Sequence, residues 1–388
     1  MLSAVQLKPD VYWVGALDWN AREFHGYTTE AGITYNAYLI MDEKVTLIDT
    51  AKSIFADELL QRISSVVDPS KIDILIANHV EPDHSGNIPT IAGLNPDLQI
   101  YCSAPAGVKG LTAHYGDLGY HGVKTGDTLC VGKRTLAFVQ TPFVHWPDNM
   151  VTYDAEDKIL FSNDAFGQHF ASSARFDDEN DLAVLYYEAK KYYANILTLY
   201  GRQAQTALKA LKDLPIEMIA TGHGIIWRSH VKEIHDLYEK WSTGVLEKRA
   251  VVVFDTMWHS TEQMARTITE AFQEEGVPAT FYDIKENPLS DILTDILTSE
   301  YLAVGSPTIN NQIMPTIASF LCYLKGLTAK GHKAFAFGSY GWGGQSIGLV
   351  EEELKAAGCD IVLDKQRLLN TPDENTLEAL REAVHTII

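Results

Sequence analysis

From residue 250 onward, short apolar runs alternate with segments of helical pattern, and no other feature limits the fold of this chain as strongly. The runs cover residues 250–254, 279–284, 301–305, 333–338 and 360–363. Helix-patterned segments follow them near 261–275, 290–298, 315–325, 345–357 and 373–386. Such alternation is typical of a parallel sheet that is buried on both faces. We therefore predict an α/β fold with a doubly wound five-stranded parallel sheet, whose ligand site lies at the carboxyl ends of the strands.

The residues before 250 have a different pattern. Meander-like β segments and further strands are mixed with helices: strands at 11–14, 34–41, 45–49, 73–77, 99–102, 135–140 and 150–153, and helices near 53–66 and 185–212. This mixture predicts a layered α/β structure. Because a single core stops growing near about 250 to 300 residues, we expect two domains in a chain of 388 residues. The helical stretch 231–246 ends just before the apolar run, which predicts domains 1–249 and 250–388.

The charge of the chain limits its partners. It has 31 basic and 51 acidic residues, and its formal charge of -20 repels phosphate backbones and anionic lipid headgroups. We therefore expect no nucleic-acid partner and no membrane partner. Residues 1–15 lack the pattern of a signal peptide, and no apolar stretch is long enough to span a membrane. These features predict a cytoplasmic protein.

The cysteines exclude several metal sites. Cys102, Cys130, Cys322 and Cys359 are too widely separated to form a CxxC motif. Zinc knuckles, rubredoxin-type iron and iron–sulfur clusters of the CxxC kind are therefore not expected.

The most informative turn follows the apolar strand at 73–77. It carries His79, Glu81, Asp83 and His84. In an extended segment residues i, i+2 and i+4 project to one side, so the first three side chains should converge on one point. A lone His beside an Asp is more often an exposed polar turn. Four ligand-type residues directly behind a buried strand instead indicate a metal site.

Three further ligand-type residues follow other apolar strands. His145 follows the strand at 135–140, Asp164 follows Ile159–Asn163, and His223 follows the run that begins at Ile219. Each of them alone is compatible with a satisfied polar group at a strand end. Together with the turn, they predict a binuclear metal site.

This pattern resembles the metallo-β-lactamase superfamily, whose HxHxDH motif and distant His, Asp and His ligands lie on an αβ/βα sandwich. Glu81 stands where the zinc hydrolases of that superfamily carry a histidine. A carboxylate in that place makes the site harder and more anionic, which favours redox iron over zinc, although affinity order alone does not select a metal. The HxExDH variant resembles the flavodiiron proteins, also called A-type flavoproteins.

Three loops of the second domain are expected at the carboxyl ends of strands. The loop 255–261 precedes a helix, where hydroxyls and free backbone N–H groups can hold a phosphate. The chain has no GxxxxGK[ST] motif and no GxGxxG motif, which argues against a triphosphatase and an NAD-binding unit. The three loops resemble those of a flavodoxin. This resemblance implies that FMN is bound by Thr256, Met257, Trp258, His259, Ser260, Thr261, Pro307, Thr308, Ile309, Asn310, Ser339, Tyr340, Gly341, Trp342 and Gly343.

The flavodiiron resemblance also implies two non-haem iron ions. One iron would be held by His79, Glu81 and His145, the other by Asp83 and His223, with Asp164 as the bridge. His84 would be either a ligand or a neighbour that orients a ligand carboxylate.

Two residues resemble the pair that lines the substrate pocket in this family. They are His25 and Tyr193, whose side chains are suited to donating hydrogen bonds or protons. Taken singly, each is more often explained by packing.

The resemblance implies reduction of O2 to water, of NO to N2O, or of both. Reduced FMN and a diferrous pair together carry the four electrons that O2 requires, and two electrons suffice for coupling two NO molecules. The chain has neither a four-cysteine module nor a pyridine-nucleotide motif, so we expect an external donor: rubredoxin, another small redox protein or a reduced deazaflavin. In this family the subunits pair head to tail, which implies a homodimer or a dimer of dimers.

Two other functions are compatible with parts of the pattern. One is a binuclear hydrolase that uses a metal-activated water, with a regulatory flavodoxin-like domain. Glu81 in place of histidine argues against it. The other is an electron carrier or sensor that uses only the FMN domain.

Overall fold

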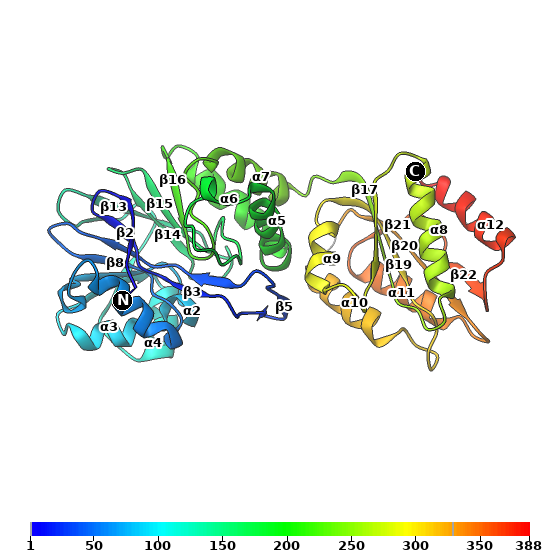
Figure 1. Ribbon diagram of the computed structural model, residues 1–388, viewed down its shortest axis with the longest axis horizontal. Coiled ribbons are helices and arrows are strands. Elements are labelled where there is room, and N and C mark those ends of the chain that lie inside the picture. Colours follow the sequence, from blue (N-terminus) through cyan, green and yellow to red (C-terminus); the bar gives the residue numbers. More distant parts are fainter. Residues whose placement is uncertain (1, 328–329) are drawn as a thin grey trace. The chain divides into compact units, whose positions relative to one another are not determined.

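The computed structural model describes residues 2–327 and 330–388. The chain divides into two compact units. The first contains the residues up to Tyr193 together with Tyr200–Thr243, and the second contains Ala194–Leu199 and the chain from Gly244 onward. The strand β17 begins at Glu247, and the domain limits 1–249 and 250–388 stay a prediction. Figure 1 shows the elements of each unit.

The first unit is built on two large sheets. One has the order β1 (Val5–Lys8), β2 (Val11–Trp13), β7 (Tyr38–Ile40), β8 (Thr46–Ile48), β9 (Ile74–Ala77), β10 (Gln99–Ser103) and β11 (Tyr120–Val123). The other has the order β12 (Thr128–Cys130), β13 (Thr135–Gln140), β14 (Met150–Asp154), β15 (Ile159–Asn163) and β16 (Met218–Thr221). Two small hairpins add β3 (Ala16–Asp18) with β6 (Ile33–Tyr35), and β4 (Glu23–Phe24) with β5 (Tyr27–Thr28).

A shared apolar core holds the two large sheets together. It joins Ile48 and Ile76 of the first sheet to Phe138, Phe161 and Ala220 of the second. Helices cover the outer faces, with α3 and α4 on the first sheet and α6 and α7 beside the second (Figure 1). The helices are α1 (Ala56–Ser64), α2 (Pro82–Ser85), α3 (Ile88–Leu94), α4 (Ala106–Tyr115), α5 (Leu182–Tyr192), α6 (Gly201–Leu211) and α7 (Val231–Thr243). The predicted αβ/βα sandwich is therefore confirmed.

One helix of the first unit differs from the prediction. The sequence pattern predicts a single helix near 185–212. The structure instead has α5, a π-helical turn at Tyr193–Leu197, a 3-10 turn at Thr198–Tyr200, and then α6. The interruption changes which side chains face inward after Tyr192.

The second unit is a parallel sheet between two helix layers. The sheet has the order β18 (Ala279–Asp283), β17 (Glu247–Phe254), β19 (Ser299–Gly305), β20 (Lys333–Tyr340) and β21 (Asp360–Ile361). Its apolar faces are packed by α9 (Leu289–Ile296), α10 (Pro315–Leu327) and α11 (Gln345–Ala356) on one side, and by α8 (Ser260–Glu274) and α12 (Glu374–His385) on the other. This order is that of doubly wound flavodoxin-like folds, so the predicted fold class is confirmed.

The fifth strand of this sheet is split. The sequence pattern predicts one strand at 360–363, whereas β21 ends at Ile361 and a further strand, β22 (Gln366–Leu369), also pairs with β20. This second segment places residues 370 and 371 at the carboxyl edge of the sheet, near the predicted loops. Within the described residues, no helix is long and apolar enough to cross a membrane.

Candidate metal centre and flavin site

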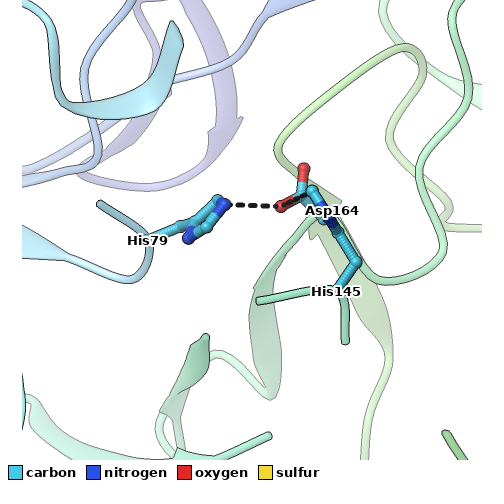
Figure 2. A group of neighbouring side chains, drawn as sticks. All are labelled: His79, His145 and Asp164. Atoms are coloured by element: carbon cyan, nitrogen blue, oxygen red, sulfur yellow. Dashed lines mark ion pairs between the residues drawn. The ribbon is translucent and has the colours of Figure 1, made fainter. Parts of the chain in front are cut away.

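The candidate metal ligands of the first unit lie where strands of both sheets end. His79 and Asp164 follow the ends of β9 and β15, and His223 follows the end of β16. His145 lies in the loop between β13 and β14. All of these side chains are buried, and in Figure 2 the rings of His79 and His145 lie around the carboxylate of Asp164.

Four of these side chains form a first cluster. The Nε2 atoms of His79 and His145 lie 3.2 and 3.3 Å from Oε2 of Glu81. The same nitrogens lie 3.6 and 3.4 Å from Oδ2 of Asp164. Two imidazoles and two carboxylates thus surround one small space.

A second cluster lies on the other side of the Asp164 carboxylate. Its Oδ1 atom is 3.1 Å from Nε2 of His84 and 3.4 Å from Nε2 of His223. Oδ2 of Asp83 is 3.6 and 3.3 Å from the same two nitrogens. Each oxygen of Asp164 therefore faces a different cluster, as a carboxylate that bridges two cations does.

The donor atoms of both clusters fit metal ions. Atoms bound at about 2.0 to 2.2 Å from one tetrahedral ion are about 3.3 to 3.6 Å apart, and most of the separations above fall in that range. Both carboxylate oxygens of Asp83 and the Nδ1 atom of His84 are buried without a hydrogen-bond partner. A buried carboxylate without a donor is costly unless a cation compensates it.

Two neighbours orient the histidines. Asp148 Oδ2 lies 2.8 Å from Nδ1 of His79 and also accepts the Val80 N–H. Nδ1 of His223 lies 2.6 Å from the carbonyl oxygen of Thr34. Because these acceptors hold a proton on Nδ1, the Nε2 atoms of both rings point into the clusters, where a metal ion would take the place of a proton.

The acidic surroundings stabilise positive charge in the clusters. Burial opposes protonation of His79, but its hydrogen bonds to Asp148 and Glu81 outweigh that effect and raise its pKa well above the usual range. Burial likewise opposes protonation of His84, but Asp83 and Asp164 raise its pKa to about 9. The carboxylates thus create a potential that suits cations.

The turn that carries the motif is only partly extended. We expected His79, Glu81 and Asp83 to converge because they alternate along an extended segment. Glu81 is extended, with φ −57° and ψ 138°, but the helix α2 begins at Pro82, so Asp83 and His84 lie in its first turn. Proline favours that position because its fixed φ suits a helix start. The side chains still converge, by way of a strand end followed by a helical turn.

His25 lies beside the first cluster. Its Nε2 is hydrogen-bonded to Oε1 of Glu81, and about half of its side chain is exposed. The hydrogen bond to Glu81 raises its pKa, against the opposing effect of burial. His25 therefore contacts a proposed metal ligand while part of its side chain remains exposed, and its role in a substrate pocket stays a prediction.

Tyr193 is not in the pocket where we expected it. Its ring packs against Tyr238 and Trp241. The adjacent Tyr192 reaches the site instead, because its hydroxyl donates to Oδ1 of Asp164 at 3.0 Å. The side chains of neighbouring residues on a helix point about 100° apart. An error of one position in the prediction therefore names a residue of the core in place of one that faces the site.

His169 lies close to the candidate ligands but was not predicted from the sequence. It is buried, and its Nδ1 is hydrogen-bonded to the hydroxyl of Tyr27. Its ring centroid is 4.9 Å from that of His223. No apolar strand runs directly into His169, so the pattern that found the other histidines does not apply to it.

The three predicted loops of the second unit line one cavity of about 510 Å³. This volume lies in the range of small-molecule and cofactor sites, about 300 to 1,000 Å³. The cavity is lined by nine predicted residues: Met257, Trp258, Ser260, Pro307, Thr308, Ser339, Tyr340, Gly341 and Trp342. Asn370 and Thr371, which follow β22, also line it and were not predicted.

The other six predicted residues do not line this cavity: Thr256, His259, Thr261, Ile309, Asn310 and Gly343. Thr261 is buried, and its hydroxyl lies 3.0 Å from that of Ser339. Thr256 is also buried, and its Oγ1 has no hydrogen-bond partner. The helix α8 begins at Ser260 without a side-chain cap. A free hydroxyl and free N–H groups at a helix start fit a phosphate.

Comparison with known protein families gives two matches, one in each part of the chain. Residues 33–224 match the family described as ODP family beta lactamase, and residues 252–386 match the flavodoxin family. The two matches fall on the sandwich and on the parallel sheet, respectively.

Relatives resemble the chain over almost all of its length. A nitric oxide reductase from Moorella thermoacetica is 42% identical over 94% of this chain and 92% of its own. The rubredoxin oxygen:oxidoreductase from Desulfovibrio gigas has 39% identity and a TM-score of 0.96, over 99% of this chain and 98% of its own. The flavodiiron protein from Giardia intestinalis has 34% identity and a TM-score of 0.96, over 100% of this chain and 96% of its own.

These findings define a class of protein that joins a metallo-β-lactamase-like unit to a flavodoxin-like unit. The chain belongs to the flavodiiron protein family. It is an oxidoreductase of the flavodiiron type.

Proposed function

We propose that this protein reduces O2 to water, or NO to N2O, at a diiron centre in the domain 1–249. FMN bound in the domain 250–388 would relay electrons from an external donor. The names of the Moorella thermoacetica and Desulfovibrio gigas relatives support these two substrates and rubredoxin as the donor. When bound, fully reduced FMN and two ferrous ions would together supply four electrons, which is the number that O2 requires.

The observation that carries the proposal is the position of Asp164. Its two carboxylate oxygens face two separate groups of ligands, each with two imidazoles and another carboxylate. This arrangement suits two cations that act on one small substrate. Glu81 adds a hard anionic donor to the first group, which favours iron.

The residues have distinct roles in this proposal. His79, Glu81 and His145 would hold one ion, Asp83 and His223 would hold the other, and Asp164 would contribute an oxygen to each. His84 lies as close to Asp83 and Asp164 as His223 does, within 3.6 Å, which supports a ligand role for it.

Two side chains near the clusters can handle protons. Tyr192 donates to the bridging carboxylate, and His25 is hydrogen-bonded to Glu81 at the partly exposed side of the site. Reduction of either gas consumes protons, so a titratable group between solvent and the ligands is useful there. We assign His25 to orienting Glu81 and to exchanging protons with solvent.

The proposed flavin site is formed by the three loops and by the start of α8. The N–H groups at the start of α8 and the hydroxyl of Thr256 would hold the phosphate of FMN. Tyr340 and Trp342, which line the same cavity, would contact the flavin ring. We also propose a head-to-tail homodimer, as expected for the family, in which each subunit receives electrons from the flavin of its partner.

Anaerobic loading with iron tests the proposal. Purified protein should bind two irons and one FMN, and it should consume O2 or NO when reduced rubredoxin is supplied. The same protein loaded with zinc is the control and should form neither water from O2 nor N2O from NO, although its reduced flavin can still pass two electrons to O2 and form hydrogen peroxide. If the iron-loaded protein reduces neither gas, while the zinc-loaded protein hydrolyses an ester or a lactam, the hydrolase interpretation is correct instead.

A further inference from the structure

A small apolar cavity lies between the second sheet and the helices that cover it. The sheet side is formed by Val151 and by the loop residues Val144 and Ala165, and the helix side includes Ala204 and Ala207. Thr141 and Tyr238 are the lining residues that carry hydroxyl groups, and no charged side chain is among the described residues that line it.

Two residues that line this cavity are adjacent in the chain to proposed metal ligands. Val144 directly precedes His145, and Ala165 directly follows Asp164. A molecule in the cavity would therefore be separated from the first cluster by the chain that carries its ligands.

The other side of the cavity adjoins a groove. This groove has a volume of about 940 Å³ and is bordered by the polar side chains of Lys8, Lys212 and Lys232. Phe166 and Leu211 line both the groove and the cavity. They form the common wall between the two spaces.

The backbone of Phe166 is held in place at this wall. Its φ of 65° is in the left-handed region, which residues other than glycine seldom adopt. Its N–H donates to the hydroxyl of Tyr238, and its carbonyl accepts from the indole of Trp227, at 2.8 and 2.9 Å. With the backbone fixed in this way, passage through the wall depends on rotation of the Phe166 ring.

The size and lining of the cavity limit what can bind in it. The volume open to the centre of a water-sized molecule is about 10 Å³, which is enough for one small molecule. Water needs two to four polar partners to occupy a cavity, whereas an apolar cavity stays dry and can take an apolar gas.

We propose that this cavity is a binding site for an apolar diatomic gas and the last stage of a dry route to the metal centre. The gas would enter from the groove, pass the Phe166 ring, and occupy the space between Val144, Ala165 and Ala207. This inference rests on the proposed function because it concerns delivery of O2 or NO.

Pressurised crystals test the cavity without any turnover. Crystals of the zinc-loaded protein are exposed to krypton, which is a compact apolar atom. Density for krypton between Val151 and Ala207 is expected. In crystals of Ala207→Leu that density should disappear, whereas it should persist in Ala210→Leu, which places the same side chain on the exposed face of α6. A cavity that remains empty, or that holds ordered water, contradicts the proposal.

Rapid mixing of the reduced, iron-loaded protein with O2 or NO tests the route. Ala207→Leu should slow the second-order reaction by at least about tenfold, which is within the range of association rates among variants of one site. Leu208→Ala enlarges the cavity and should not slow it, and Ala210→Leu should match the unmodified protein. If the unmodified protein reacts but all variants react equally fast, the route is wrong while the proposed function holds. If the unmodified protein does not react, the proposed function itself fails.

Discussion

The Nδ1 atom of His79 lies 2.8 Å from Oδ2 of Asp148, and both side chains are buried. The same carboxylate oxygen accepts the Val80 N–H. Asp148 therefore fixes both the ring and the backbone of the strand end that begins the motif. A carboxylate that holds a ligand histidine in this way also increases the basicity of its other nitrogen.

We expect Asp148→Ala to weaken iron binding by about 10- to 100-fold, the range found when such partners are removed. Iron retained against increasing chelator concentrations measures this effect. Asp148→Asn is the matched control, because its amide oxygen can still accept from His79 and Val80, and it should retain most of the affinity. Equal iron retention in all three proteins would contradict the role assigned to Asp148.

We expect Asp83→Ala to abolish O2 consumption and to leave the flavin absorbance unchanged. Both oxygens of Asp83 are buried without a hydrogen-bond donor, and a bound cation would compensate that burial. An oxygen electrode and an absorbance spectrum of the same sample measure the two properties. Loss of flavin in this variant would show that the two sites depend on one another.

We expect Thr256→Val to weaken FMN binding by about ten- to a hundredfold, since a hydrogen bond to a charged group contributes about 1.5 to 3 kcal/mol. Quenching of FMN fluorescence by the flavin-free protein gives the affinity. Thr269→Val is the matched control, because the hydroxyl of Thr269 bonds to Ala265 within α8. Unchanged affinity in Thr256→Val would remove this residue from the phosphate site.

A decrease in pH should lower the free energy of unfolding of the second unit, because His332 is buried there. Burial lowers the pKa of this histidine, although its hydrogen bond to the Ser299 carbonyl opposes the shift. The unfolded chain therefore binds a proton more readily than the folded chain does. The stabilising effect of the neutral ring is complete above about pH 6.5, the ordinary histidine value, and is lost as the pH falls from there towards the lowered pKa.

Melting temperatures at pH 7.5 and pH 5 test this prediction. The decrease in melting temperature between the two should be smaller in His332→Gln than in the unmodified protein. His121→Gln alters an exposed histidine and should show the same decrease as the unmodified protein. An equal decrease in all three would contradict the assignment to His332.

The sequence predicts the fold and the centre of the site because local patterns of residues indicate both. Apolar runs mark the strands, and the ligand-type residues follow the ends of those runs. The seven side chains from His79 to His223, which the sequence pattern singled out, converge because strand ends of two packed sheets meet in the structure.

The neighbours of the ligands depend on contacts that local patterns do not contain. Asp148 is 69 residues from His79, and Thr34 is 189 residues from His223. Tyr192 rather than Tyr193 contacts Asp164, and the two tyrosines are adjacent in the chain, so the helical pattern alone does not decide between them. Asn370 and Thr371 line the candidate flavin site because the fifth strand of the sheet in the second unit is split.

Anaerobic stopped-flow mixing of the fully reduced, iron-loaded protein with O2 or NO tests the central claim most directly. We predict rapid loss of the reduced-flavin signal with at least one of the two gases. With O2, one molecule should be consumed for each FMN and pair of ferrous ions. A flavin that stays reduced in the presence of both gases, with both irons bound, would contradict it.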